Sequence, residues 1–241
     1  MKSFILDLKK DRIFVAIFRA VAAVLILFGI LAGLNISGSE TNYTGLLFYT
    51  YQSNILAMLF LLVLAVRTVV DIIKNGRVGP VSYFERFSAF TALSIFITMF
   101  IFWPLLAPLG LIDLWTFDNL MLHLFAPLLM IADYLLFTKC GKLKKNDAFL
   151  FMIGPLFYYI QATILGFSGV SYGVFNDVEY FFPYFFMDYY TIGWWVAAFV
   201  PSMFVALWAM GHGLFVLDRK RGRQKEEVIT VAEEDELVVK L

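Results

Sequence analysis

The sequence has few of the residues from which metal and redox sites are built. It contains one cysteine, Cys140, and two histidines, and only 16% of its 241 residues are charged. A single cysteine excludes an internal disulfide and any metal site built from several cysteines. The two histidines fall in different predicted membrane spans and at opposite depths, so they cannot share one ion. We therefore expect no metal and no organic cofactor. The balanced charge, with 19 basic and 19 acidic residues, does not indicate a nucleic-acid partner.

Apolar residues are abundant instead. They make up 61% of the chain, and the mean hydropathy is +0.80. Apolar stretches of roughly 20 residues, the length that crosses about 30 Å of hydrocarbon, recur along the sequence. Backbone groups in hydrocarbon must bond internally, and these stretches do not alternate with period two, so each is predicted to be a helix. The sequence thus predicts an all-α, polytopic membrane protein with a bundle of six transmembrane helices. The predicted spans are 13–34, 48–70, 87–108, 118–138, 148–167 and 190–216.

Basic residues alternate between the two sides of these spans. Lys and Arg occur before the first span, between the second and third, between the fourth and fifth, and after the sixth, whereas the other three connections contain none. Because Lys and Arg near helix ends stay in the cytoplasm, both termini are predicted to be cytoplasmic. The first span is too long for a signal peptide, so we expect it to be retained. The predicted organisation is a cytoplasmic segment 1–12, one membrane domain 13–217 and a disordered cytoplasmic tail 218–241.

Two clusters of polar residues interrupt the apolar spans near their outer ends. In the second span Thr50, Ser53 and Asn54 are spaced to share one helix face, and in the fourth Asn119 precedes His123 by one turn. Thr50 and His123 each lie within roughly 3 to 8 Å of the outer edge. A hydroxyl beside an imidazole is the minimal pair for nucleophilic catalysis, because the base removes the proton as the hydroxyl attacks. Hydroxyl side chains in membrane helices also bond across helices, so a structural role fits the same residues.

A set of short motifs resembles one family of membrane proteins. The motifs are Phe48 to Asn54, Asn119 to His123 with Pro127, Asp133 to Phe137, Pro155 with Tyr158 and Tyr159, and Phe182 to Phe185. Together they are similar to the bacterial Pr6Pr family, a relative of the eukaryotic androgen-induced-gene (FAR-17a-like) proteins, over about 13–217. The resemblance implies a multi-pass hydrolase that cleaves fatty acid esters of hydroxy fatty acids with a threonine and a histidine. By motif position the threonine is Thr50 and the histidine is His123. The expected location of the protein is a bacterial plasma membrane.

The other members of such a site remain open. Ser53 is an alternative nucleophile, although the resemblance favours Thr50. The candidates for orienting the imidazole are Asp118, Asn119, Asp177 and Asp188. The candidate donors to a developing oxyanion are Asn54 and Gln161, followed by Gln52 and Tyr184. The expected partner is a membrane lipid or fatty-acyl ester substrate, and no protein partner is implied. The alternative function is a non-catalytic lipid-binding or transport protein that uses the same polar pocket.

Two charged residues lie closer to the cytoplasmic side of their spans. Arg19 is about 9 Å and Asp133 about 7 Å from the inner edge at 1.5 Å per residue. Charges at this depth are costly, so we expect the two to form an ion pair that fixes the first helix against the fourth. The alternative is that Arg19 extends to the headgroups. His212, near the inner end of the last span, is expected to be structural.

Overall fold

A computed structural model describes residues 10–36, 38, 41–110, 113–175 and 177–239. Within these ranges six helical segments are long and apolar enough to cross a membrane, which confirms the predicted spans to within a few residues at most ends. The segments are Arg12–Gly33, Tyr49–Asn75, Glu85–Leu109, Phe117–Phe137, Asp147–Phe167 and Gly193–Gln224. The largest difference is in the last segment, which extends beyond the predicted 216.

The elements follow one another with short connections. The helices are α2 (Arg12–Gly33), α3 (Tyr49–Asn75), α4 (Glu85–Ile101), α5 (Phe117–Leu120), α6 (Ala126–Phe137), α7 (Asp147–Leu150), α8 (Ile153–Phe167) and α9 (Val196–Val239). Short 3-10 turns occupy Tyr43–Leu47, Ala107–Leu109, Phe185–Met187 and Gly193–Trp195. A two-stranded antiparallel hairpin, β1 (Gly173–Phe175) and β2 (Val178–Tyr180), which the sequence did not predict, pairs Val174 with Glu179. The hairpin lies in the connection between the fifth and sixth spans.

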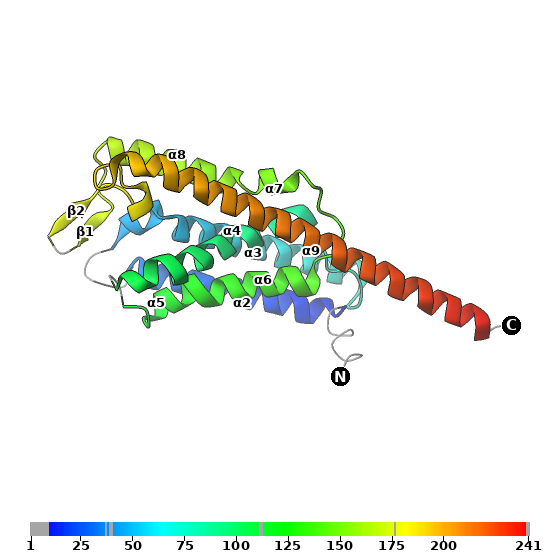
Figure 1. The fold of residues 1–241 in the computed structure, drawn as a ribbon. Coiled ribbons are helices and arrows are strands. Elements are labelled where there is room, and N and C mark those ends of the chain that lie inside the picture. Colours follow the sequence, from blue (N-terminus) through cyan, green and yellow to red (C-terminus); the bar gives the residue numbers. More distant parts are fainter. Residues whose placement is uncertain (1–9, 37, 39–40, 111–112, 176, 240–241) are drawn as a thin grey trace.

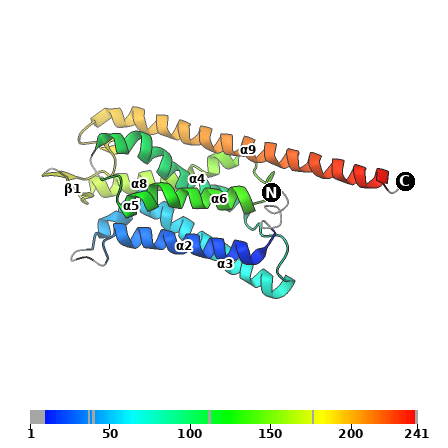
Figure 2. The ribbon, with the colours of Figure 1, turned by 90° about the horizontal axis from the view of Figure 1, so that it is seen from below.

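The helices run along a common axis, and the first residues of α2 and the last of α9 lie at the same end of the bundle (Figures 1 and 2). We call this the terminal end, and the opposite end, which holds the β hairpin, the hairpin end. Helices α2 and α3 pack extensively against each other, and α4 packs on α6. Fully buried apolar side chains such as Ile26, Leu61 and Met130 join these helices in one core. Helix α9 packs on α7 and forms the edge of the bundle.

Two spans contain a π-helical turn close to the hairpin end. Phe102–Leu106 follows α4, and Met121–Phe125 joins α5 to α6. Proline lies in or just after each turn, as Pro104 and Pro127. Proline has no N–H and its ring clashes with the preceding turn, so a regular helical bond is lost and the local pitch changes. The apolar pattern alone predicts regular helix for both segments.

Helix α9 continues to Val239, where the sequence predicts a disordered tail from 218. Asp218 accepts hydrogen bonds from the hydroxyl of Tyr134 and the backbone N–H of Leu143, and Arg221 donates to the carbonyl of Leu135 at 2.6 Å. These bonds hold the start of the expected tail against the bundle. The residues that follow are mostly good helix formers and, after Gly222, include no glycine or proline. The helix therefore has no local signal to stop, and it extends past the bundle (Figure 1).

Arg19 and Asp133 meet inside the bundle, as the sequence predicts. Arg19 Nε donates to Asp133 Oδ1 at 2.7 Å, and their side chains are 1% and 0% exposed. Arg19 Nη1 also donates to Thr68 Oγ1 at 2.9 Å, a contact the sequence did not indicate. Arg19 thus bonds within the protein and does not extend to the headgroups. The group joins α2, α3 and α6, and each charge has a hydrogen-bonding partner, as buried charges require.

Candidate active site

Thr50 and His123 come together at the hairpin end. Thr50 is the second residue of α3, which begins after the extended residue Phe48, and His123 lies in the π turn of the fourth span. Thr50 Oγ1 lies 3.3 Å from His123 Nε2, and both residues are buried. Residues far apart in the sequence thus form the hydroxyl–imidazole pair that the sequence predicts.

The backbone of Asn119 determines which nitrogen of His123 faces the threonine. His123 Nδ1 lies 3.1 Å from the carbonyl oxygen of Asn119. A carbonyl can only accept, so Nδ1 carries the hydrogen and Nε2 presents its lone pair to the Thr50 hydroxyl. The imidazole is therefore oriented by a main-chain group. The side chain of Asn119 points elsewhere, since its Nδ2 donates to the carbonyl of Asp113 at 2.6 Å.

The π turn of the third span supports the imidazole from the side. The ring of Phe102 stacks on that of His123, with centroids 3.6 Å apart and an interplanar angle of 18°. The indole N–H of Trp103 donates to the carbonyl of His123 at 3.1 Å. Pro127, four residues after His123, has no N–H to bond that carbonyl, so Trp103 satisfies it. The sequence did not indicate a role for Phe102 or Trp103. The prolines were the only sequence signal for the two π turns, and π turns are frequent at functional sites.

Ser53 and Asn54 brace the pair and do not face the cavities beside it. Ser53 Oγ donates to the carbonyl of Thr50 at 3.1 Å and lies 2.7 Å from Thr98 Oγ1. Asn54 Nδ2 donates to the carbonyls of Thr50 at 2.8 Å and Leu122 at 3.1 Å. Both amide hydrogens of Asn54 are used, so the expectation that it donates to an oxyanion does not fit the structure. Its position holds α3 against the fourth span.

Three other candidates, Gln52, Gln161 and Asp188, form hydrogen bonds with groups other than Thr50 and His123. Gln52 Nε2 donates to Gln161 Oε1 at 3.3 Å and to the carbonyl of Leu46, so the two glutamines bond to each other. Asp188 accepts hydrogen bonds from the backbone of Tyr190 and from Thr191, including the Thr191 hydroxyl at 2.6 Å. It thereby caps the turn before the last span and does not orient His123.

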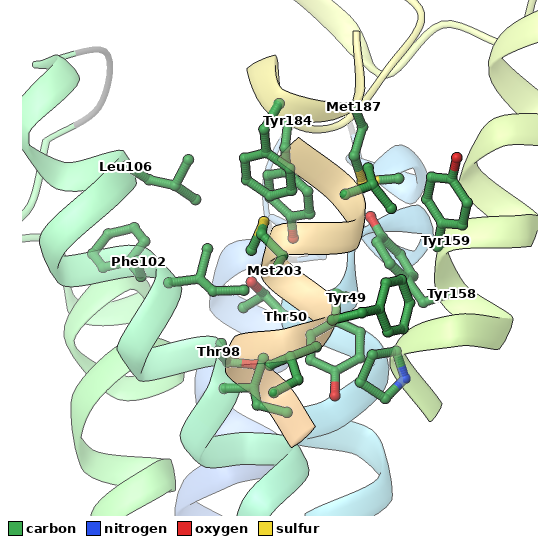
Figure 3. A pocket seen from close by; sticks show the side chains of 17 residues that line it. Tyr49, Thr50, Thr98, Phe102, Leu106, Tyr158, Tyr159, Tyr184, Met187 and Met203 are labelled. Atoms are coloured by element: carbon green, nitrogen blue, oxygen red, sulfur yellow. The ribbon is translucent and has the colours of Figure 1, made fainter. Parts of the chain in front are cut away.

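Two cavities meet at Thr50. One, of about 70 Å³, extends between α3, α4, α8 and α9 and has mainly apolar walls (Figure 3). Its apolar lining includes Ile97, Ile101, Val200, Met203, Phe204 and Leu207. The other, of about 310 Å³, is lined by more polar residues, among them Asp118, Asn119 and His123. Thr50 and Tyr184 line both cavities, so a ligand spanning the two would pass the threonine hydroxyl.

Tyr184 is the candidate donor that reaches this point. It comes from the connection after the β hairpin, and its hydroxyl interacts with the side chains of Thr50 and Tyr158. Burial raises the pKa of the Tyr184 hydroxyl to about 12, so it keeps its proton at neutral pH and can donate. Among the four expected donors, it is the one that lines both cavities at Thr50 in the described part of the chain.

Comparison with known proteins adds no assignment: no protein-family model, no curated protein and no solved structure matches this chain. Across the described residues, no group of three or more His, Cys, Asp or Glu side chains is placed to hold a metal ion. The case for function therefore rests on the geometry around Thr50 and on the motifs in the sequence.

Proposed function

We propose that the protein hydrolyses lipid esters within the membrane, with Thr50 as the nucleophile and His123 as the base. One observation carries the proposal: the buried Thr50 hydroxyl lies 3.3 Å from an imidazole nitrogen whose partner nitrogen is bonded to a carbonyl. This is the arrangement that activates a hydroxyl nucleophile. The separation is somewhat long for a hydrogen bond, as is common in active sites without substrate.

The cavities fit a substrate with a chain on each side of its ester. The apolar walls of the first cavity match the polarity of the start of an acyl chain, and the more polar walls of the second match the alcohol portion, with the ester carbonyl at Thr50 between them. The resemblance to the Pr6Pr family suggests fatty acid esters of hydroxy fatty acids or similar lipid esters. Thr50 stands at the start of a spanning helix, where an ester near the headgroups is within reach.

The proposed reaction has two half-reactions at Thr50. His123 Nε2 takes the hydroxyl proton as Oγ1 attacks the ester carbonyl carbon, and the Tyr184 hydroxyl donates to the oxyanion that forms. The protonated imidazole then gives its proton to the leaving alcohol, which departs as the acyl-threonine forms. Water attacks this ester with His123 again as base, and the carboxylic acid leaves with Thr50 restored. The Asn119 carbonyl stabilises the imidazolium in each half.

We also propose which end of the helix bundle faces the cytoplasm. Lys and Arg gather in the segments at the terminal end, and the connections at the hairpin end contain none. By the preference of basic residues for the cytoplasm, the terminal end faces inward and the active site opens to the outer leaflet of a bacterial plasma membrane. An added tag at either terminus should then be accessible only from the cytoplasmic side.

The test compares hydrolysis of a branched fatty acid ester by purified wild type, Thr50→Ala, His123→Ala and Ser53→Ala. A hydroxyl-reactive phosphonate, located by mass spectrometry, reports the nucleophile. We expect Thr50→Ala and His123→Ala, each assayed as folded protein below its own melting temperature, to lose at least about 10³-fold in kcat/KM. Ser53→Ala removes the alternative nucleophile and one supporting bond, so it should keep the label on Thr50 and lose far less turnover than the other two variants.

Two results would contradict the catalytic assignment. If folded wild type turns over no ester class and takes no label, or if the two alanine variants remain fully active, the catalytic assignment is wrong. Lipid binding without hydrolysis, or transport, then becomes the better account of the same cavities.

A further inference from the structure

A cationic groove lies at the terminal end, far from Thr50 along the bundle. Spans Glu85–Leu109 and Asp147–Phe167 both begin there, so the first turns of α4 and α7 lie at the same membrane surface. Between them is a groove of about 710 Å³. Its lining residues are Arg86, Lys144, Lys145, Asn146, Asp147, Phe149 and Leu150.

The groove continues toward the membrane interior as an apolar trough. A second hollow of about 360 Å³ shares Arg86, Asp147 and Leu150 with the first. Its other walls are Phe87, Phe90, Phe151 and Ile153. Phe87, Leu150 and Ile153 are each more than 40% exposed. The cationic mouth therefore adjoins an apolar trough between α4 and the α7–α8 segment.

A buried carboxylate fixes the shape of the mouth. Asp147 is 1% exposed and is held by Arg86, whose Nε donates to it at 2.9 Å and whose Nη2 also bonds to it. Asp147 Oδ2 further accepts the backbone N–H of Lys144 at 2.9 Å. The ion pair ties the lysine-bearing connection to α4. The side chains of Lys144 and Lys145 remain exposed, so the mouth carries a net positive charge.

We propose that this groove binds one anionic phospholipid, with its phosphate at Lys144, Lys145 and Arg86 and an acyl chain along Phe87 and Ile153. Charge complementarity selects the headgroup, because lysines at a membrane surface attract anionic lipids. The apolar trough selects a membrane lipid over a free phosphate, since a soluble anion would leave those side chains uncovered. The site is independent of the proposed hydrolase activity.

Native mass spectrometry of the detergent-purified full chain tests this site. The chain is titrated with phosphatidylglycerol or phosphatidylcholine of the same acyl length. The Thr50→Ala background is used, so hydrolysis does not consume the probe. We expect preferential binding of one phosphatidylglycerol. Replacing both lysines, as Lys144→Gln with Lys145→Gln, should weaken this binding about 25-fold, at about fivefold per lysine. Phosphatidylcholine binding should not change.

Two controls decide between a site and general surface attraction. Lys139→Gln with Lys142→Gln removes the same charge from the same connection, outside the groove, and should leave phosphatidylglycerol affinity within about twofold. Glycerophosphoglycerol, which has the headgroup without chains, should not displace the lipid at millimolar concentration. Equal weakening by both lysine pairs, equal affinity for the two lipids, or displacement by the soluble headgroup would each overturn the proposal.

Discussion

The Arg19–Asp133 pair and the Thr50–His123 pair both appear in the sequence as polar residues within apolar spans, but their surroundings in the structure differ. The Arg19–Asp133 pair is charged, fully enclosed and satisfied by hydrogen bonds to each other and to Thr68. The Thr50–His123 pair is drawn from neutral groups, and its hydroxyl faces two cavities. Enclosure and complete pairing indicate a group that holds helices together. A polar pair beside a cavity indicates a group that can act on a ligand.

The largest effect that separates the two groups is expected from Asp133→Ala. It would leave the Arg19 guanidinium buried without its carboxylate, which costs about 3–5 kcal/mol of stability for a buried pair. Thermal unfolding in detergent measures it. Arg19→Met with Asp133→Leu removes both charges and should recover most of the loss. If Asp133→Ala instead leaves the melting temperature unchanged and abolishes ester hydrolysis, the distinction between the two groups fails.

Tyr184→Phe should lower the rate of ester hydrolysis, and this is a smaller effect than the loss of stability expected from Asp133→Ala. Loss of one donor to an oxyanion lowers kcat by about 10²-fold, with little change in KM. Tyr172→Phe is the matched control, since its buried hydroxyl has no hydrogen-bond partner among the described residues and lies outside both cavities. Steady-state kinetics on a lipid ester measure both variants. A loss shared equally by the two would assign Tyr184 to packing and remove it from the reaction.

Asn119→Ala should have the smallest effect. The carbonyl that orients His123 belongs to the main chain and survives the substitution, so kcat/KM is expected to stay within about twofold. The bond from Asn119 Nδ2 to the Asp113 carbonyl is lost, at about 1 kcal/mol of stability. Kinetics and thermal unfolding of the same preparation test both expectations. If turnover instead falls by about a hundredfold or more at normal stability, the side chain itself orients the imidazole.

The parts of the fold that depend on local composition were predictable. Apolar run length located the spans, and helical spacing brought Thr50 and His123 to one depth. The partners of these residues were not predictable, because they depend on how each helix is rotated and on its pitch. Asn54 shares a face with Thr50, yet its Nδ2 donates to two backbone carbonyls. Phe102 and Trp103 read as ordinary apolar residues, and only the altered turn brings them to the histidine.

The π turn at Met121–Phe125 makes the site sensitive to chain length as well as to residue type. A π turn accommodates one residue more than an α-helical turn over the same rise. Deleting a single residue from this stretch would restore an ordinary helical turn, so the two flanking stretches would stay aligned while the side chains inside the turn change direction. His123, which lies inside the turn, would then lose its contact with Thr50, whereas Asp133, in the regular helix that follows, would keep Arg19. A homologue one residue shorter here would keep its hydropathy profile and yet lack the assembled pair.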